Sequence, residues 1–175
     1  KGYLYSLIVA FAVWTVLLPL QLLKLLFGKS SLDEIIQRMA WIQSNRLNHL
    51  QTIIIHAVSY VEMVAAEPII SRLVGENTNL RVILTTGNKD GMVAAQSLRS
   101  RYPNIINSMF LPWDRAHAIK HWLTILQPDL VVLVETEIWP NLISACRNLE
   151  IPVCIVNGRI YPKDVARYRL IHGFM

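Results

Sequence analysis

Downstream of residue 50, short runs rich in valine and isoleucine alternate regularly with longer stretches of helical hydrophobic period. The apolar runs have the length of buried strands and lie at 53–58, 82–84, 105–111, 130–134 and 153–156. The helical stretches between them lie at 61–74, 92–101, 115–126 and 139–149. Continuous apolar strands separated by helices are typical of a parallel sheet that is covered on both faces. With right-handed crossovers, this pattern predicts a Rossmann-like, doubly wound α/β domain over residues 51–175.

A long uncharged run precedes this domain. Residues 2–23 contain no charged side chain, and at about 1.5 Å per residue a helix of this length could cross a hydrocarbon core of about 30 Å. Lys24 and Lys29 follow the run, and positive charge there favours a cytoplasmic location for the following domain. We expect residues 1–28 to anchor the chain to a membrane, by spanning it or by lying in its interface; the alternative is a buried core helix. Residues 29–50 are predicted to be a linker that contains one helix.

The distribution of charge argues against a nucleic-acid partner. The chain has 17 Lys and Arg against 12 Asp and Glu, a formal net charge of +5. Residues 1–50 carry five basic and two acidic side chains, and residues 159–175 carry four and one. The middle of the chain, 51–158, carries eight and nine. Because a nucleic-acid interface needs a basic face on the folded domain, we expect no nucleic-acid partner.

Polar side chains follow the ends of the predicted strands, where ligands bind in doubly wound sheets. The candidate site residues after the first, fourth and fifth strands are His56, Ser59, Glu62, Glu135, Glu137, Asn157 and Arg159. Three of them are carboxylates, and like charges at one edge raise one another's pKa, which suits a general base. The sequence has no GxGxxG after the first strand, no P-loop lysine motif and no HExxH or Cys/His cluster. A dinucleotide or metal site of the usual kind is therefore disfavoured.

Each candidate also has a structural interpretation. A histidine at a strand end, such as His56, is more often a hydrogen-bonding group than a catalyst. An acid in a first helical turn, such as Glu62, often serves only the helix dipole. Asp114 precedes a predicted helix and could be its N-cap, and Glu67 is expected to be solvated or to bridge two helices. Convergence of three carboxylates at one sheet edge is what favours chemistry.

Four segments carry a resemblance to a known family: IIIHAVSYVEMVAAEP (53–68), FLPWD (110–114), PDLVVLVETEIWPNLI (128–143) and IPVCIVNGRI (151–160). They resemble the 3-deoxy-D-manno-octulosonic acid (Kdo) transferases of lipopolysaccharide synthesis, and ETEIWPNLI is the most specific stretch. These are two-domain GT-B glycosyltransferases, and the resemblance covers only the N-terminal half of such an enzyme. It implies that the chain is the acceptor-binding domain and that the donor-binding domain lies outside it. The chain starts at Lys1 and stops at Met175 within a predicted helix, so we expect it to be part of a longer protein that is inactive without the other half.

The resemblance also implies residue roles. Glu62 occupies the position of the glutamate that closes the family's H-S-V-S-V-G-E motif and acts as the general base. The other candidate residues would bind the acceptor, a lipid A precursor, at the cytoplasmic face of the inner membrane. A hydroxyl of the acceptor would attack the anomeric carbon of Kdo with inversion while CMP departs from CMP-Kdo. CMP is a good leaving group without a diphosphate to bridge, so neither a metal nor a cofactor is expected. Of the two later carboxylates, Glu135 is predicted to lie in the acceptor site and Glu137 to be structural.

Two alternatives remain open. Val61 and Met63 stand where the family has glycine and threonine, which favours a diverged GT-B glycosyltransferase that uses another nucleotide sugar and another glycolipid. The second alternative is a membrane-tethered binding domain that retains the scaffold without turnover.

Overall fold

The computed structural model describes residues 2–42, 50–77 and 79–159, and it confirms the predicted parallel α/β fold. Five parallel strands form one sheet in the order β3-β2-β1-β4-β5. The strands are β1 (Gln51–His56), β2 (Leu80–Thr86), β3 (Ile105–Phe110), β4 (Leu130–Val134) and β5 (Val153–Val156). Because β1 pairs with both β2 and β4, the loops that follow these three strands lie side by side at the carboxyl edge.

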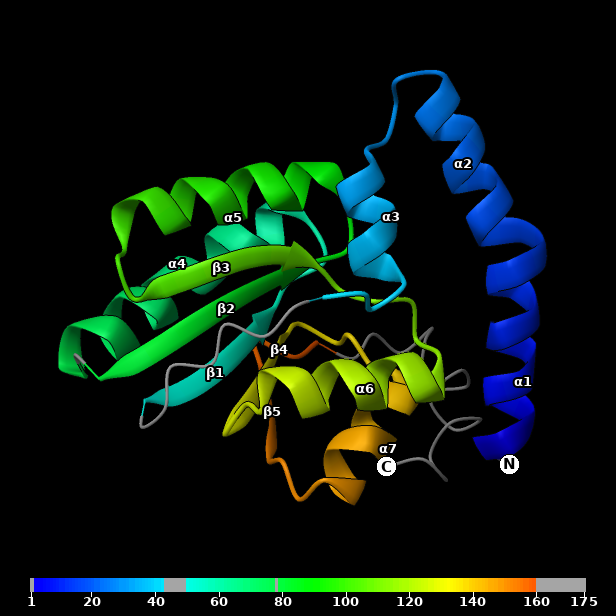
Figure 1. Cartoon of the computed structure of the whole chain (residues 1–175). Coiled ribbons are helices and arrows are strands. Elements are labelled where there is room, and N and C mark those ends of the chain that lie inside the picture. The colour runs from blue at the N-terminus through cyan, green and yellow to red at the C-terminus, as the bar shows by residue number, and fades with distance from the viewer. Residues whose placement is uncertain (1, 43–49, 78, 160–175) are drawn as a thin grey trace.

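Four helices cover the two faces of the sheet (Figure 1). They are α4 (Tyr60–Glu76), α5 (Lys89–Arg101), α6 (Ala116–Leu126) and α7 (Pro140–Asn148). The alternation of side chains along β1 builds both cores, since Ile54 packs with residues of α6 and α7, and Ile55 packs with residues of α4 and α5. Burial of each such side chain contributes about 1.5–3 kcal/mol, so the two apolar layers hold the strand ends in fixed positions.

The uncharged N-terminal run forms a long helix, as predicted. It consists of α1 (Gly2–Ala12), a π-helical turn η1 (Val13–Leu17) and α2 (Leu18–Leu26), and it lies at the side of the domain in Figure 1. Tyr3–Leu26 is long and apolar enough to cross a membrane by length and composition, and only 11% of its most apolar window is buried. This helix could therefore anchor the protein to a membrane.

Helix α3 (Leu32–Arg38) lies within the predicted linker and packs against the end of β3. Ser31 caps it, because its hydroxyl accepts a hydrogen bond from the Glu34 amide at 3.1 Å. The Gln37 side-chain oxygen accepts a hydrogen bond from the Phe110 amide at 2.8 Å, and Ile35 is buried. These contacts fix α3 to the sheet. The rest of the predicted linker, 43–49, lies outside the described residues.

Candidate active site

The turn between β1 and α4 holds Glu62 in a closed hydrogen-bonded arrangement. Glu62 Oε2 accepts hydrogen bonds from the amides of Val58 (2.6 Å) and Ser59 (3.4 Å). The Ser59 hydroxyl donates to Glu62 Oε1 (3.0 Å) and accepts from the Glu62 amide (3.4 Å), which completes a capping box. Glu62 thus has a structural role at the start of α4, where it takes part in the capping box. Ser59 is the N-cap of α4, and Val61, directly before Glu62, is 73% exposed.

His56 ends β1 and is completely buried. Its Nδ1 lies 3.0 Å from Thr85 Oγ1, and within the described part of the chain its Nε2 has no hydrogen-bond partner. Burial lowers the pKa of His56 to about 4, so the imidazole is neutral at physiological pH. The ring faces Trp139 edge-on, with centroids 6.4 Å apart. His56 therefore packs inside the core, beneath the loops at the carboxyl edge of the sheet.

The loop between β4 and α7 carries the other two carboxylates. Glu135 adopts a left-handed backbone conformation (φ 63°), and its amide donates to the Val156 carbonyl at 2.8 Å. Burial raises the pKa of Glu137, and the negative charges of Glu62 and Glu135 raise it further. The nearby indole N–H of Trp139 lowers the pKa of Glu137 in part. Within the described residues, however, this N–H makes no hydrogen bond of normal geometry.

The three carboxylates lie near enough for the charges of Glu62 and Glu135 to act on the pKa of Glu137. Their joint role in a site stays a prediction. The raised pKa falls on Glu137, the residue that the sequence interpretation left as structural. The assignment of Glu135 to the acceptor site and of Glu137 to a structural role stays a prediction.

Asp114 does not cap the helix that follows it. Helix α6 begins at Ala116 with Arg115 as its N-cap and has no side-chain cap, so the sequence interpretation of Asp114 was wrong. Its carboxylate instead caps α7, since Oδ2 accepts from the Asn141 amide (3.0 Å) and Oδ1 from the Leu142 amide (2.9 Å). Burial raises the pKa of Asp114, while the hydrogen bonds from Asn141, Tyr5 and Leu142 act in the opposite direction. Two distant loops are fastened together in this way.

The same carboxylate also receives the N-terminal helix. The Tyr5 hydroxyl donates to Asp114 Oδ2 at 2.9 Å, and the Ser6 hydroxyl donates to Asn141 Oδ1 at 2.7 Å. The apolar helix is thus attached by polar bonds to the start of α7, directly after the Glu135–Trp139 loop. Sequence reasoning missed this seam, because the polar residues within the uncharged run gave no sign of their partners.

Asn157 and Arg159 lie after β5 at the outer end of this edge. Asn157 has a left-handed backbone (φ 54°), and the Arg159 amide donates to Thr136 Oγ1 at 2.9 Å. That bond joins the β5 end to the Glu135–Glu137 loop. Both side chains are exposed, and within the described residues neither forms a hydrogen bond with the three carboxylates.

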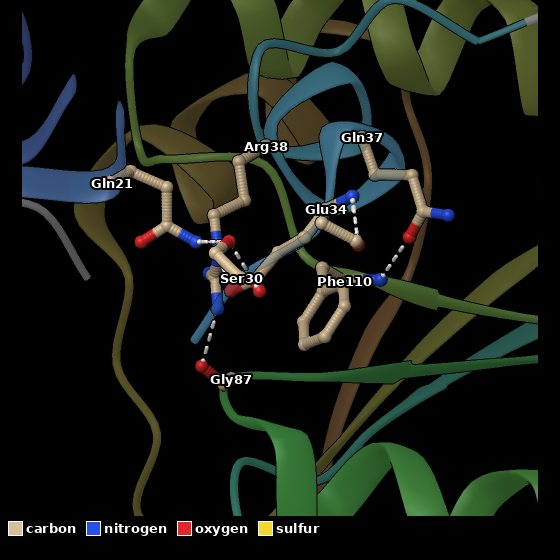
Figure 2. A network of polar contacts seen from close by, with 8 residues as sticks. Gln21, Ser30, Glu34, Gln37, Arg38, Gly87 and Phe110 are labelled. Carbon is tan, nitrogen blue, oxygen red and sulfur yellow. Dashed lines mark hydrogen bonds and ion pairs between the residues drawn. The ribbon is translucent and has the colours of Figure 1, made fainter. Parts of the chain in front are cut away.

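A further polar network lies next to the site and was also missed (Figure 2). Arg38 at the end of α3 forms an ion pair with Glu34 at 3.0 Å and donates to the Gly87 carbonyl at 2.8 Å. The spacing of four residues on one helix was the available signal, but nothing in the sequence indicated that this pair would be buried. Glu67 bridges α4 and α5 through Arg101 and Tyr102, as one of its two interpretations predicted.

Within residues 2–42, 50–77 and 79–159, no group of three or more His, Cys, Asp or Glu side chains is arranged to hold a metal ion. The described loops of the carboxyl edge present carboxylates, hydroxyls and amides. Such groups can accept a proton from a hydroxyl and can hydrogen-bond a polyhydroxylated ligand.

Comparison with known proteins identifies the family. Residues 33–175 match the family model of 3-deoxy-D-manno-octulosonic-acid transferases (kdotransferases). A 3-deoxy-D-manno-octulosonic acid transferase of Haemophilus influenzae is 31% identical over 125 residues, which cover 71% of this chain and 29% of that protein. A probable mitochondrial enzyme of the same name from Arabidopsis thaliana is 32% identical over 65% of the chain and 25% of that protein.

A third relative, from Rickettsia bellii, matches the largest share of the chain among these three. This 3-deoxy-D-manno-octulosonic acid transferase is 26% identical over 152 residues, 87% of the chain and 35% of that protein. The chain thus spans between a quarter and about a third of the length of the relatives described here. With a family model that covers more than half of its residues, the chain belongs to the 3-deoxy-D-manno-octulosonic acid transferase family.

Proposed function

We propose that this chain is the acceptor-binding and general-base part of a glycosyltransferase that moves Kdo from CMP-Kdo to a lipid A precursor. The observation that carries the proposal is the gathering of Glu62, Glu135 and Glu137 at the carboxyl edge of the sheet, in a chain of this family. In the proposed reaction the acceptor hydroxyl bonds to the anomeric carbon of Kdo. The bond from that carbon to the CMP phosphate oxygen breaks, and CMP leaves with the electron pair. A carboxylate takes the hydroxyl proton.

Glu62 is proposed as the base. Its carboxylate receives three hydrogen bonds, from two amides and the Ser59 hydroxyl, and a carboxylate has about four acceptor positions. One position is thus left for a substrate hydroxyl, in an orientation that the capping box fixes before the acceptor binds.

Glu137 is the second candidate for the base. Its raised pKa is the specific observation in its favour, because a base with a pKa nearer to neutral accepts a proton more readily. The remaining candidates would serve the acceptor: Ser59, Glu135, Asn157 and Arg159 as hydrogen-bonding groups at the edge, and the buried His56 as support beneath them.

The N-terminal helix is proposed to hold the domain at the cytoplasmic face of the inner membrane, beside a lipid-borne acceptor. Its large apolar side chains are open to the surroundings, among them Tyr3, Leu7, Phe11, Trp14 and Leu26. An apolar surface of this extent on a soluble protein would be unfavourable in water, and a membrane would cover it. The domain should therefore sediment with inner membranes and resist extraction by salt. Release by salt alone would contradict an apolar anchor.

The test of function is a transfer assay with the full-length protein, CMP-Kdo and a lipid A precursor in detergent micelles. We expect a Kdo-bearing lipid and free CMP in equal amounts, with the same rate in EDTA because no metal is proposed to take part. Residues 1–175 alone should be inactive, since the donor-binding half would be missing. Transfer from a different nucleotide sugar alone would support the diverged glycosyltransferase. Binding of the lipid without turnover by the full-length protein would support the binding domain.

A further inference from the structure

Arg38 lies between three elements, and its guanidinium makes three contacts. Its Nε pairs with Glu34 Oε1 at 3.0 Å, and one terminal nitrogen donates to the Gly87 carbonyl at 2.8 Å. The guanidinium also lies over the Phe110 ring, 4.7 Å from its centroid. The Arg38 side chain is 13% exposed and that of Glu34 only 6%, so the pair is shielded from solvent screening. Figure 2 shows Arg38 reaching from α3 to the Gly87 loop.

The Gly87 loop in turn holds the backbone of Val58. The Val58 carbonyl accepts hydrogen bonds from the Gly87 amide (3.1 Å) and from Thr86 Oγ1 (2.9 Å). A side chain at position 87 would collide with Val58, because a Cβ there would lie 2.7 Å from Val58 Cγ1. The two loops thus touch closely, and the position of the Val58 carbonyl depends on where Gly87 is held.

Val58 then presents its amide to the candidate base. The Val58 N–H donates to Glu62 Oε2 at 2.6 Å, the shorter of the two amide bonds to that carboxylate. A continuous series of polar contacts therefore runs from Arg38 through Gly87 and Val58 to Glu62. Three hydrogen bonds make up this series, and the backbones of Gly87 and Val58 join them covalently.

We propose that Arg38 is a positioning residue: it fixes the Gly87 carbonyl and, through the backbones of Gly87 and Val58, sets the orientation of the Glu62 carboxylate. The proposal rests on the function proposed above for Glu62. A guanidinium suits this task because its rigid fork bonds Glu34 and Gly87 at once, which a lysine ammonium cannot do in the same geometry.

The experiment uses the full-length protein and a double variant, Arg38→Gln with Glu34→Gln, so that no unpaired charge is left buried. The matched control is Arg72→Gln with Glu76→Gln, since that pair has the same four-residue spacing but is 81% and 67% exposed. Arg38→Lys is the second variant, because it keeps the charge opposite Glu34 and protects the fold. Hydrogen exchange at the amides of Val58 and Gly87 is measured together with kcat and KM.

We expect amide exchange at both positions to rise about tenfold in the double variant, because a hydrogen bond that holds the turn is lost. We expect kcat to fall about 10- to 100-fold with KM within about twofold of wild type, because misplacement of a base affects the chemical step. Arg38→Lys should change both in the same direction and by less, and the control pair should change neither. Unaltered exchange at Val58 and unaltered kcat in a folded Arg38→Lys or double variant would overturn the proposal. If the wild-type protein transfers no Kdo, the proposed function fails, and the exchange measurement still decides whether Arg38 positions the turn.

Discussion

The two carboxylate-bearing loops of the site begin their helices in opposite ways. After β1, Ser59 and Glu62 cap α4 themselves, and the Glu62 carboxylate is bound up in its own helix start. After β4, the N-cap residue of α7 is Trp139, whose side chain does not cap the helix. Asp114, from another loop, supplies the capping carboxylate instead. The difference shows how a loop can be freed for chemistry. When a distant residue caps the helix, the loop's own carboxylates are not needed as caps. Burial, with the charges of Glu62 and Glu135, raises the pKa of Glu137 in this loop.

The largest expected effect separates the two loops by activity. In the full-length enzyme, the Glu→Gln change at the true base should lower kcat by a factor of about 10²–10⁴ because the hydroxyl proton loses its acceptor. Glu62→Gln and Glu137→Gln are compared under identical conditions, with the exposed Glu76→Gln as control. A large loss in Glu62→Gln alone would show that a carboxylate in a capping box can also act as base. A large loss in Glu137→Gln alone would assign the base to the loop freed by Asp114.

Acid should destabilise the β1 end of the site through His56. Its pKa is 6.5 when unfolded and about 4 in the folded protein, so the unfolded state takes up the proton first as the pH falls. Stability from this group is intact above pH 6.5, and about 3 kcal/mol of it is lost as the pH falls to about 4. Urea denaturation at several pH values measures the loss. His56→Gln should lose less stability over this range, whereas the exposed His117→Gln should behave like wild type.

Removal of the two caps should sharpen the comparison. Asp114→Ala should lower the free energy of unfolding by about 2 kcal/mol, because the amides of Asn141 and Leu142 lose their acceptor in a buried place. Ser59→Ala should lower it by about 1 kcal/mol, since Glu62 can still bond the Val58 amide. Urea denaturation of both variants tests the order. Equal losses would mean that the cap from Asp114 contributes no more to the free energy of unfolding than the local cap from Ser59.

The smallest effect is a gain in stability at the β4 loop. The pKa of Glu137 is raised in the folded state, so the folded protein becomes less stable as the pH rises through that pKa. Glu137→Gln removes this penalty and should raise Tm slightly at pH 8, with no gain at pH 4. Thermal unfolding at the two pH values checks it. A lower Tm at pH 8 would show that the ionised carboxylate is stabilised where it lies.

Periodicity predicted the five strands because most of their buried apolar residues are valine or isoleucine. It shortened β2, which extends from Leu80 to Thr86, because Arg81 and Thr85 are polar yet buried. Arg81 is accommodated by a hydrogen bond to Thr52 Oγ1 at 2.8 Å, a partner 29 residues away. Long-range partners of this kind leave no local pattern, and the capping role of Asp114 was hidden for the same reason. The position of the three carboxylates on loops at one edge of the sheet could be predicted, because parallel strands bring their carboxyl ends to the same edge.

The polar seam on the apolar helix also bears on how the protein assembles. Tyr5 and Ser6 leave the ribosome well before Asp114 and Asn141, the residues that later accept their hydrogen bonds. At first, therefore, these bonds of the helix cannot form. In hydrocarbon the hydroxyls of Tyr5 and Ser6 are unfavourable, whereas at the membrane surface water can satisfy them. If the helix is the proposed membrane anchor, it should therefore stay at the lipid–water boundary until the sheet has formed. Docking against the completed domain then fixes its rotation about its own axis and selects the side that meets the lipid.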